Sequence, residues 1–137
     1  MSVIPASLRV YVTLRAGYRC EYCGLAQAGQ EAAFHMDHII PRTAGGETSD
    51  QNLALACVSC SLRKSSRQVA VDPDSGTEVS LFNPRVQEWG EHFRWDGEKV
   101  VGLTPYGRAT VTTLAMNRPL IVAIRQEEAI RGRHPQP

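Results

Sequence analysis

Four cysteines form two Cys-x-x-Cys pairs, Cys20/Cys23 and Cys57/Cys60, with 33 residues between the pairs. This spacing suits a four-thiolate zinc site, two disulfides or a redox pair. The chain lacks the apolar core and cleavage site of a signal peptide, so we expect a cytoplasmic, reducing environment that favours zinc over disulfides. Neither pair lies in a thioredoxin-like βαβ pattern, which argues against a redox protein. Four thiolates leave no open position on the ion, so the predicted zinc is structural.

The segment between the cysteine pairs contains a carboxylate and an imidazole next to each other, Asp37 and His38. Hydrolysis of a phosphodiester needs a base for the attacking water and positive charge near the phosphate. A neutral histidine is a suitable base near pH 7, and a carboxylate can hold Mg²⁺ or a similar hard cation. Asn52 can fix the intervening loop or the imidazole by hydrogen bonding. Taken alone this set is weak evidence, because a histidine in a strand is more often structural.

The apolar pattern predicts a strand over residues 34–40, and Pro41 closes it. Ideal pleating places His35 and Asp37 on one face of this strand and His38 on the other. Asp37 and His38 have to reach one phosphate if they act together. We therefore expect either a distorted strand or a base and a metal ion on two sides of the phosphate.

Turn residues and apolar spacing predict the remaining elements. Helices are expected at residues 5–16, 59–67, 104–117 and 119–131, with a short helical stretch starting at Asn83. Hairpins are expected where 69–71 pairs with 78–81 and within 93–103; residues 43–51 should be an exposed loop and 131–137 a frayed tail. The chain is thus predicted to be one α+β domain, residues 1–137. Residues 1–68 hold the N-terminal helix and the metal-bound core, and 69–137 form a C-terminal hairpin and helix extension.

The composition is that of an ordinary globular protein, 42% hydrophobic and 21% charged over 137 residues. No apolar run approaches the roughly 20 residues of a membrane span, so no membrane association is expected. A net charge of +1 does not by itself indicate a polyanionic partner. Thirteen of the fifteen basic residues are arginines, whose planar fork suits bidentate contact with phosphate.

The motifs occur in a characteristic order: Cys20-x-x-Cys23, His35-Met-Asp37-His38-Ile-Ile-Pro41, Gly45-Gly46, Asn52-Leu53, and Cys57-x-x-Cys60 ending at Lys64. In this order and spacing they resemble the HNH endonucleases of the zinc-bearing, ββα-metal type. The segments 81–85, 92–93 and 102–110, with Trp89 and Met116-Asn117, resemble a bacterial HNH subgroup that has a C-terminal extension. The resemblance implies a small zinc-clamped ββα unit followed by hairpins and helices.

The resemblance also implies a metal-dependent endonuclease that hydrolyses DNA phosphodiester bonds, with structural Zn²⁺ and a catalytic Mg²⁺ or other divalent cation. It assigns His38 as the general base, Asp37 as a ligand of the catalytic ion and Asn52 as the residue that orients the loop and the base. The third motif position usually supplies His or Asn as a second ligand. Here it is Ser61, whose neutral hydroxyl is a weaker ligand. His35 is either a substitute ligand or a residue with a role in packing or at the surface.

The implied partner is double-stranded DNA, cut with little sequence preference. Candidate phosphate contacts are Arg42 and three residues expected on the exposed face of helix 59–67, namely Arg63, Lys64 and Arg67. Contacts of this kind position the duplex without specifying its sequence. The rival interpretation is a non-catalytic, zinc-dependent nucleic-acid-binding module in which Ser61 has impaired the catalytic ion site.

Overall fold

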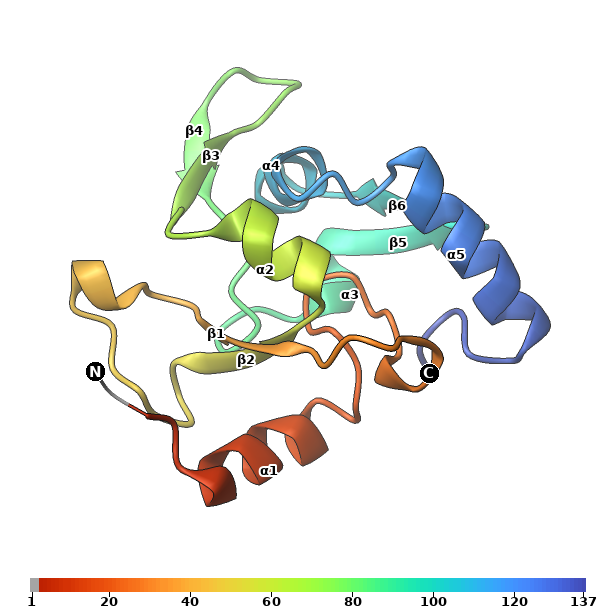
Figure 1. Cartoon of the computed structure of the whole chain (residues 1–137). Coiled ribbons are helices and arrows are strands. Elements are labelled where there is room, and N and C mark those ends of the chain that lie inside the picture. Colours follow the sequence, from red (N-terminus) through yellow and green to blue (C-terminus); the bar gives the residue numbers. More distant parts are fainter. Residues whose placement is uncertain (1–2) are drawn as a thin grey trace.

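The computed structural model describes residues 3–137 and confirms the mixed α+β class (Figure 1). The helices are α1 (Ala6–Arg15), α2 (Val58–Lys64), α3 (Trp89–His92), α4 (Pro105–Thr113) and α5 (Pro119–Ile130), with 3₁₀ turns at Gln27–Gly29 and Arg42–Ala44. The strands form antiparallel pairs: β1 (His35–His38) with β2 (Leu53–Ala56), β3 (Val69–Val71) with β4 (Glu78–Ser80), and β5 (Phe93–Asp96) with β6 (Lys99–Gly102). Within residues 3–137, no helix is both long and apolar enough to cross a membrane.

Strand β2 runs through the centre of the N-terminal half, between α1 and α2 (Figure 1). All four of its residues are buried, as expected for a strand that is covered on both faces. From α1, Val12 is fully buried and Arg15 donates a hydrogen bond to the Leu53 carbonyl at 2.8 Å. Gly17 follows α1 with a φ of 63°, a conformation that favours glycine and ends the helix. Helix α2 packs on both β1 and β2, which completes the ββα unit.

The β5–β6 hairpin and α4 form the centre of the C-terminal half. The hairpin turns at Gly97, with φ of 61°, as the Asp-Gly pair predicts. Helix α4 begins as expected, because the Thr104 hydroxyl caps it by accepting the Gly107 N–H at 3.2 Å. A Cβ atom at position 107 would lie 2.0 Å from the His92 carbonyl oxygen, so the close approach of α4 to this backbone requires glycine.

One cluster of buried apolar side chains joins the two halves of the chain. Phe82, Phe93 and Ile121 from the extension belong to the same cluster as the four cysteines. The Trp89 indole N–H also donates to the Tyr22 carbonyl at 2.8 Å. The extension therefore packs directly on the cysteine-bearing half.

The expectation of a frayed tail is wrong. The Trp95 indole N–H donates to the Gln136 side-chain oxygen at 2.9 Å. The Arg133 guanidinium lies 2.7 Å from the carboxylate of Glu128, whose side chain is only 5% exposed. Polar residues such as these give no periodic signal in the sequence, so their partners become visible only in the folded chain.

Three helices are shorter than predicted. Helix α2 ends at Lys64 instead of residue 67, because the chain turns at Ser65, where φ is 51°. Instead of starting a helix, Asn83 forms a turn in which its side-chain oxygen accepts the Arg85 N–H and its own N–H donates to the Gln87 side chain. Local bonds of this kind compete with helix formation, and Phe93 already belongs to β5. Helix α4 ends at Thr113 because the chain turns at Ala115, where φ is 47°.

A buried carboxylate ties the β3–β4 hairpin to α4. Asp72 is fully buried, and both of its oxygens lie 2.9 Å from Arg108 nitrogens. It also accepts hydrogen bonds from the Asp74 N–H and the Ser75 hydroxyl. Bonds from Arg108 and Ser75 stabilise the charged form and lower the pKa of the Asp72 carboxyl below its ordinary value.

We predict that Asp72→Asn lowers the thermal unfolding midpoint at pH 7, and that this effect shrinks in acid. A carboxyl whose pKa is lowered on folding contributes stability above its unfolded pKa of about 3.9 and loses that contribution as pH falls toward the folded pKa. Thermal unfolding of wild type and variant between pH 3 and pH 7 measures the difference. Ser80→Ala, on β4 of the same hairpin, is the control. A difference between wild type and Asp72→Asn that stays constant over this range would contradict the assignment.

Candidate functional site

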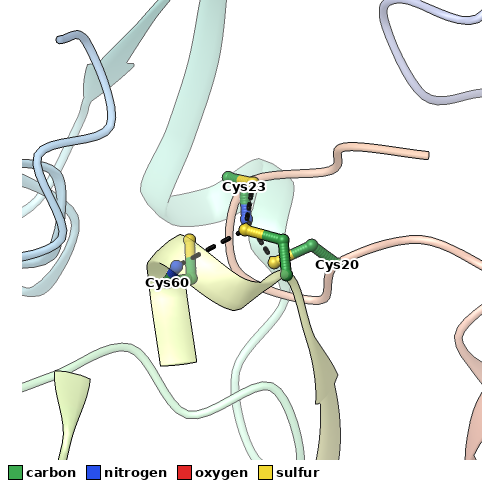
Figure 2. A group of neighbouring side chains, drawn as sticks. Cys20, Cys23 and Cys60 are labelled. Carbon is green, nitrogen blue, oxygen red and sulfur yellow. Dashed lines mark hydrogen bonds between the residues drawn. The ribbon is translucent and has the colours of Figure 1, made fainter. Parts of the chain in front are cut away.

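The four cysteine side chains converge on one buried point. Their sulfur atoms lie within 4.8 Å of one another, and each residue is 2–4% exposed. Figure 2 shows Cys20 and Cys23 on the loop that follows α1 and Cys60 on α2, with their sulfurs directed toward one another. All four are free cysteines, and the Cys23 and Cys57 sulfurs are 3.7 Å apart, far beyond a disulfide bond. Two sulfurs bound tetrahedrally to zinc at about 2.3 Å would lie about 3.8 Å apart.

The backbone around the cluster also suits a bound metal. The Cys23 N–H points at the Cys20 sulfur at 3.5 Å, and the Cys60 N–H points at the Cys57 sulfur at 3.4 Å, so that Cys57 caps α2. Hydrogen bonding among the neighbouring thiols, together with burial, raises the pKa of Cys60 well above its ordinary value. A bound divalent ion would have the opposite effect on the pKa values of these thiols, because it binds their thiolate form. The donor set, its dimensions and its burial therefore fit a structural zinc ion.

The extension places a buried guanidinium beside this cluster. Arg125 of α5 is 2% exposed, and it lines the same small cavity as Cys23. One of its terminal nitrogens donates to the Glu98 carbonyl at 3.0 Å, while the other, Nη2, is buried without a hydrogen-bond partner in the part of the chain described. Burial lowers the pKa of Arg125, and the nearby thiols oppose this shift. A cluster of four thiolates and Zn²⁺ carries net negative charge, which a neighbouring arginine offsets.

Asp37 and His38 line one open groove of about 300 Å³. Arg42 and Thr43 also line the groove, as do Ser61 of α2 and the two serines just after this helix, Ser65 and Ser66. Strand β1 keeps a regular register with β2, so of our two alternatives the distorted strand is absent, and the arrangement on two sides of the phosphate stays a prediction. Both side chains reach the groove because β1 ends at His38, where the groove opens around the strand end.

Asp37 is held from inside the protein. Its Oδ2 atom accepts the Tyr22 hydroxyl at 2.7 Å and lies 3.2 Å from the Lys64 ammonium, and the residue is 7% exposed. Burial raises the pKa of the Asp37 carboxyl, and the ion pair with Lys64 and the Tyr22 hydrogen bond oppose this. Burial also raises the pKa of Tyr22, so its phenol remains a hydrogen-bond donor. Sequence reasoning missed both partners.

The expectation that Lys64 contacts DNA is wrong, because its side chain is only 2% exposed. Besides pairing with Asp37, the ammonium donates to the carbonyls of His38 at 3.2 Å and Ile39 at 3.1 Å. Lys64 follows the buried Cys60 by four residues, and residues at that spacing share one helix face. This spacing is the sequence signal that could have identified Lys64 as buried.

His38 is oriented by the loop that follows β1. Its Nε2 atom lies 2.8 Å from the Thr48 hydroxyl oxygen, and no hydrogen bond to Nδ1 is formed within residues 3–137. Burial, followed by the positive charge of Arg42, lowers the pKa of His38 below its ordinary value of 6.5. The imidazole is therefore neutral at pH 7. Thr48 was not among the predicted site residues.

Asn52 holds the two ends of this loop together. Its side-chain oxygen accepts the Ile40 N–H at 2.9 Å, and its amide nitrogen donates to the carbonyls of Ile40 and Glu47. A Cβ atom at Gly46 would lie 1.7 Å from the Ile40 carbonyl oxygen, so the loop closes only with glycine there. Of the two roles expected for Asn52, these contacts correspond to fixing the loop.

Ser61 lies at the groove, at the position expected for the third motif residue. Its hydroxyl oxygen is 2.9 Å from His35 Nδ1, so the two residues form a pair across β1 and α2. His35 shares a strand face with Asp37, as the alternation predicts.

The remaining basic candidates are exposed but are distributed over different surfaces. Arg42 lines the groove beside His38. Arg63 and Arg67 are exposed on and just after α2, outside the groove lining. Arg42 is therefore the candidate phosphate contact closest to the Asp37–His38 pair.

Residues 20–67 match the model of the HNH endonuclease family. These residues form an HNH endonuclease domain. It has the buried four-cysteine cluster that is typical of zinc-bearing HNH domains. No match was found among curated proteins or among solved structures. The HNH domain includes the ββα unit, the cysteine cluster and the groove, whereas α1 and residues 69–137 lie outside the matched segment.

Proposed function

We propose that this protein is a metal-dependent endonuclease that hydrolyses phosphodiester bonds of double-stranded DNA. The observation that carries the proposal is that Asp37 and His38 line one open groove inside the HNH domain. A base and a carboxylate at one exposed site meet two requirements of phosphodiester hydrolysis. We also propose that residues 69–137 act as a structural extension of the HNH domain within a single domain.

We assign His38 as the general base. In the tautomer whose Nε2–H donates to the Thr48 hydroxyl, the lone pair on Nδ1 is left to accept a proton from the attacking water. Asn52 fixes the loop that carries Thr48, because it binds the backbone at Ile40 and Glu47. Arg42, exposed beside the groove, is placed to contact a phosphate oxygen.

Asp37 and Ser61 are the residues that would hold a catalytic divalent ion. Mg²⁺ in proteins usually keeps several waters and needs only one or two protein oxygens, which this pair can supply. Bound there, the ion would supply positive charge that neutralises the phosphate and its leaving oxygen. Lys64 already neutralises part of the Asp37 charge, and Ser61 shares its hydroxyl with His35, so we expect weak binding of the ion.

The direct test is nicking of supercoiled plasmid with Mg²⁺, Mn²⁺ or EDTA. We expect nicking with either metal ion, none with EDTA, and more nicking at limiting metal concentration for Ser61→Asn, because an amide oxygen is a better ligand than a hydroxyl. Ser66→Ala, which also borders the groove, is the control. Metal-independent nicking of equal rate would contradict the proposed role of Asp37.

The rival function is a nucleic-acid-binding module without activity. The buried Asp37–Lys64 ion pair and the serine at the third motif position are the observations that favour it. It predicts DNA binding without nicking in wild type. Appearance of nicking in Ser61→Asn alone would support this rival, with an intact base and an impaired ion site.

We predict that DNA binding weakens with salt through Arg42 and Arg67. Two neutralised phosphates give a slope of log K against log salt of about −1.8, or about 12-fold weaker binding from 50 to 200 mM salt. Each Arg→Ala change should reduce the slope by about one. Fluorescence anisotropy with a labelled duplex measures it, and Arg94→Ala on β5 is an exposed control. Binding that does not depend on salt would exclude these contacts.

A further inference from the structure

Residues of α2 and of the start of α5 line a second, larger groove, where the HNH domain meets the extension. Its volume is about 560 Å³, within the usual range for ligand sites. We call it the seam groove. Its apolar lining comes from both sides of the seam, namely Leu25, Phe34, Val58, Leu62, Ile121 and Ile124.

The seam groove is separate from the groove lined by Asp37 and His38, which we call the catalytic groove. The two share no lining residue, although α2 forms a wall of each. Ser61 and Ser65 face the catalytic groove, and Leu62 faces the seam groove. Leu62 is 66% exposed and lies at the edge of this apolar cavity.

Two arginines also line the seam groove, Arg63 from α2 and Arg118 at the start of α5. Arg118 donates to the Ala115 carbonyl at 3.3 Å and Arg63 to the Ser59 hydroxyl at 3.2 Å. In the described part of the chain neither arginine forms an ion pair; Arg85, Arg108, Arg131 and Arg133 are the four arginines that do. The groove therefore combines an apolar floor with two cations that have no acidic partner.

This combination decides between the possible occupants. A DNA surface is polar and charged and has no side chains to fill an apolar groove. A second copy of the chain docked with its two-fold axis through the groove would bring Arg63 and Arg118 close to the same residues of the partner, which is electrostatically unfavourable. A peptide with apolar side chains for the floor and carboxylates for the two arginines satisfies both features.

We propose that the seam groove binds an acidic, apolar-anchored peptide segment of a partner protein. The proposal does not depend on nuclease activity, because it rests on the seam groove alone. A partner bound there leaves the catalytic groove open. Such a partner would bring an endonuclease with little sequence preference to a particular DNA target.

A peptide selection tests the proposal without assuming a sequence. Random 12-residue peptides displayed on phage are selected on the full-length protein, with Leu62→Glu as the counter-selection. We expect enriched peptides to carry at least two large apolar residues and one Asp or Glu, and to bind with dissociation constants of about 1–100 µM. Binding should weaken about tenfold or more in Leu62→Glu and persist in Leu120→Glu. Leu120 is equally exposed on α5 but does not line the groove.

A second test of the proposal uses a charge-reversal variant. Arg118→Glu should weaken binding of the acidic peptides about tenfold and should itself select peptides rich in Lys or Arg. Peptides without acidic residues, or equal binding by wild type and Arg118→Glu, would overturn the proposal. Complete displacement of the peptides by a DNA duplex at 150 mM salt would assign the groove to nucleic acid. A wild-type dimer that Leu62→Glu dissociates in analytical ultracentrifugation would assign it to a second copy.

Discussion

Cys57→Ser, or removal of zinc by a strong chelator, is expected to unfold the protein, and the loss should extend beyond the N-terminal half. Structural zinc supplies on the order of 10 kcal/mol of apparent binding free energy, comparable to the whole stability of a small domain. Cys57 joins β2 to α2, so its loss releases both elements. Because Ile121 and Phe93 share the core cluster with the cysteines, the extension loses its packing partner too.

Three measurements check this expectation. Elemental analysis should find one zinc per chain, the four thiols should be protected from a thiol reagent until the protein is denatured, and circular dichroism should show lost structure after chelation. Ser59→Ala, two residues from Cys57, is the matched control that should keep both zinc and fold. Freely reactive thiols in a folded protein without zinc would show that the cysteine cluster does not hold the fold together.

His38→Ala is expected to reduce plasmid nicking by about 10²–10⁴-fold, the usual contribution of a positioned base. The fold and zinc content should not change, because His38 is partly exposed and lies at the end of β1. Thr48→Val, which removes the hydroxyl that orients the imidazole, should give a smaller loss. Full nicking activity in His38→Ala would exclude His38 as the base.

The pH dependence of nicking gives an independent check on His38. The base must be neutral to accept a proton, and burial beside Arg42 lowers the pKa of His38 below 6.5. Nicking should therefore stay constant as pH falls from 8 to 7 and decline only below about 6.5. Arg42→Gln removes one cause of the lowered pKa and should move this decline to higher pH. A decline centred above pH 7 in wild type would contradict the assignment.

The local elements were largely predictable. Pro5, Gly17 and the Thr104-Pro105 pair mark helix ends, and the structure begins or ends α1 and α4 close to them. The Asp-Gly turn of the β5–β6 hairpin was also predicted correctly. These predictions succeed because caps and tight turns depend on the conformational preferences of a few adjacent residues.

The four-cysteine cluster was predictable for a similar reason. The Cys-x-x-Cys spacing already directs two sulfurs toward one point, so only the meeting of the two pairs depends on the fold. The family match to residues 20–67 agrees with the motif order along the chain. The sequence alone therefore determined the fold class, the cysteine cluster and the HNH domain.

The partners of the candidate catalytic residues were decided only by the tertiary structure. Lys64 was expected to face solvent and instead pairs with Asp37, which lies 27 positions away in the sequence. Tyr22, from the cysteine loop between Cys20 and Cys23, donates a hydrogen bond to the same carboxylate. Arg125 and the tail follow the same pattern, since each finds its contacts far away in the sequence. Single polar residues carry no periodicity that reveals their burial, and their partners are brought near only when α2, the cysteine loop and α5 pack around one core.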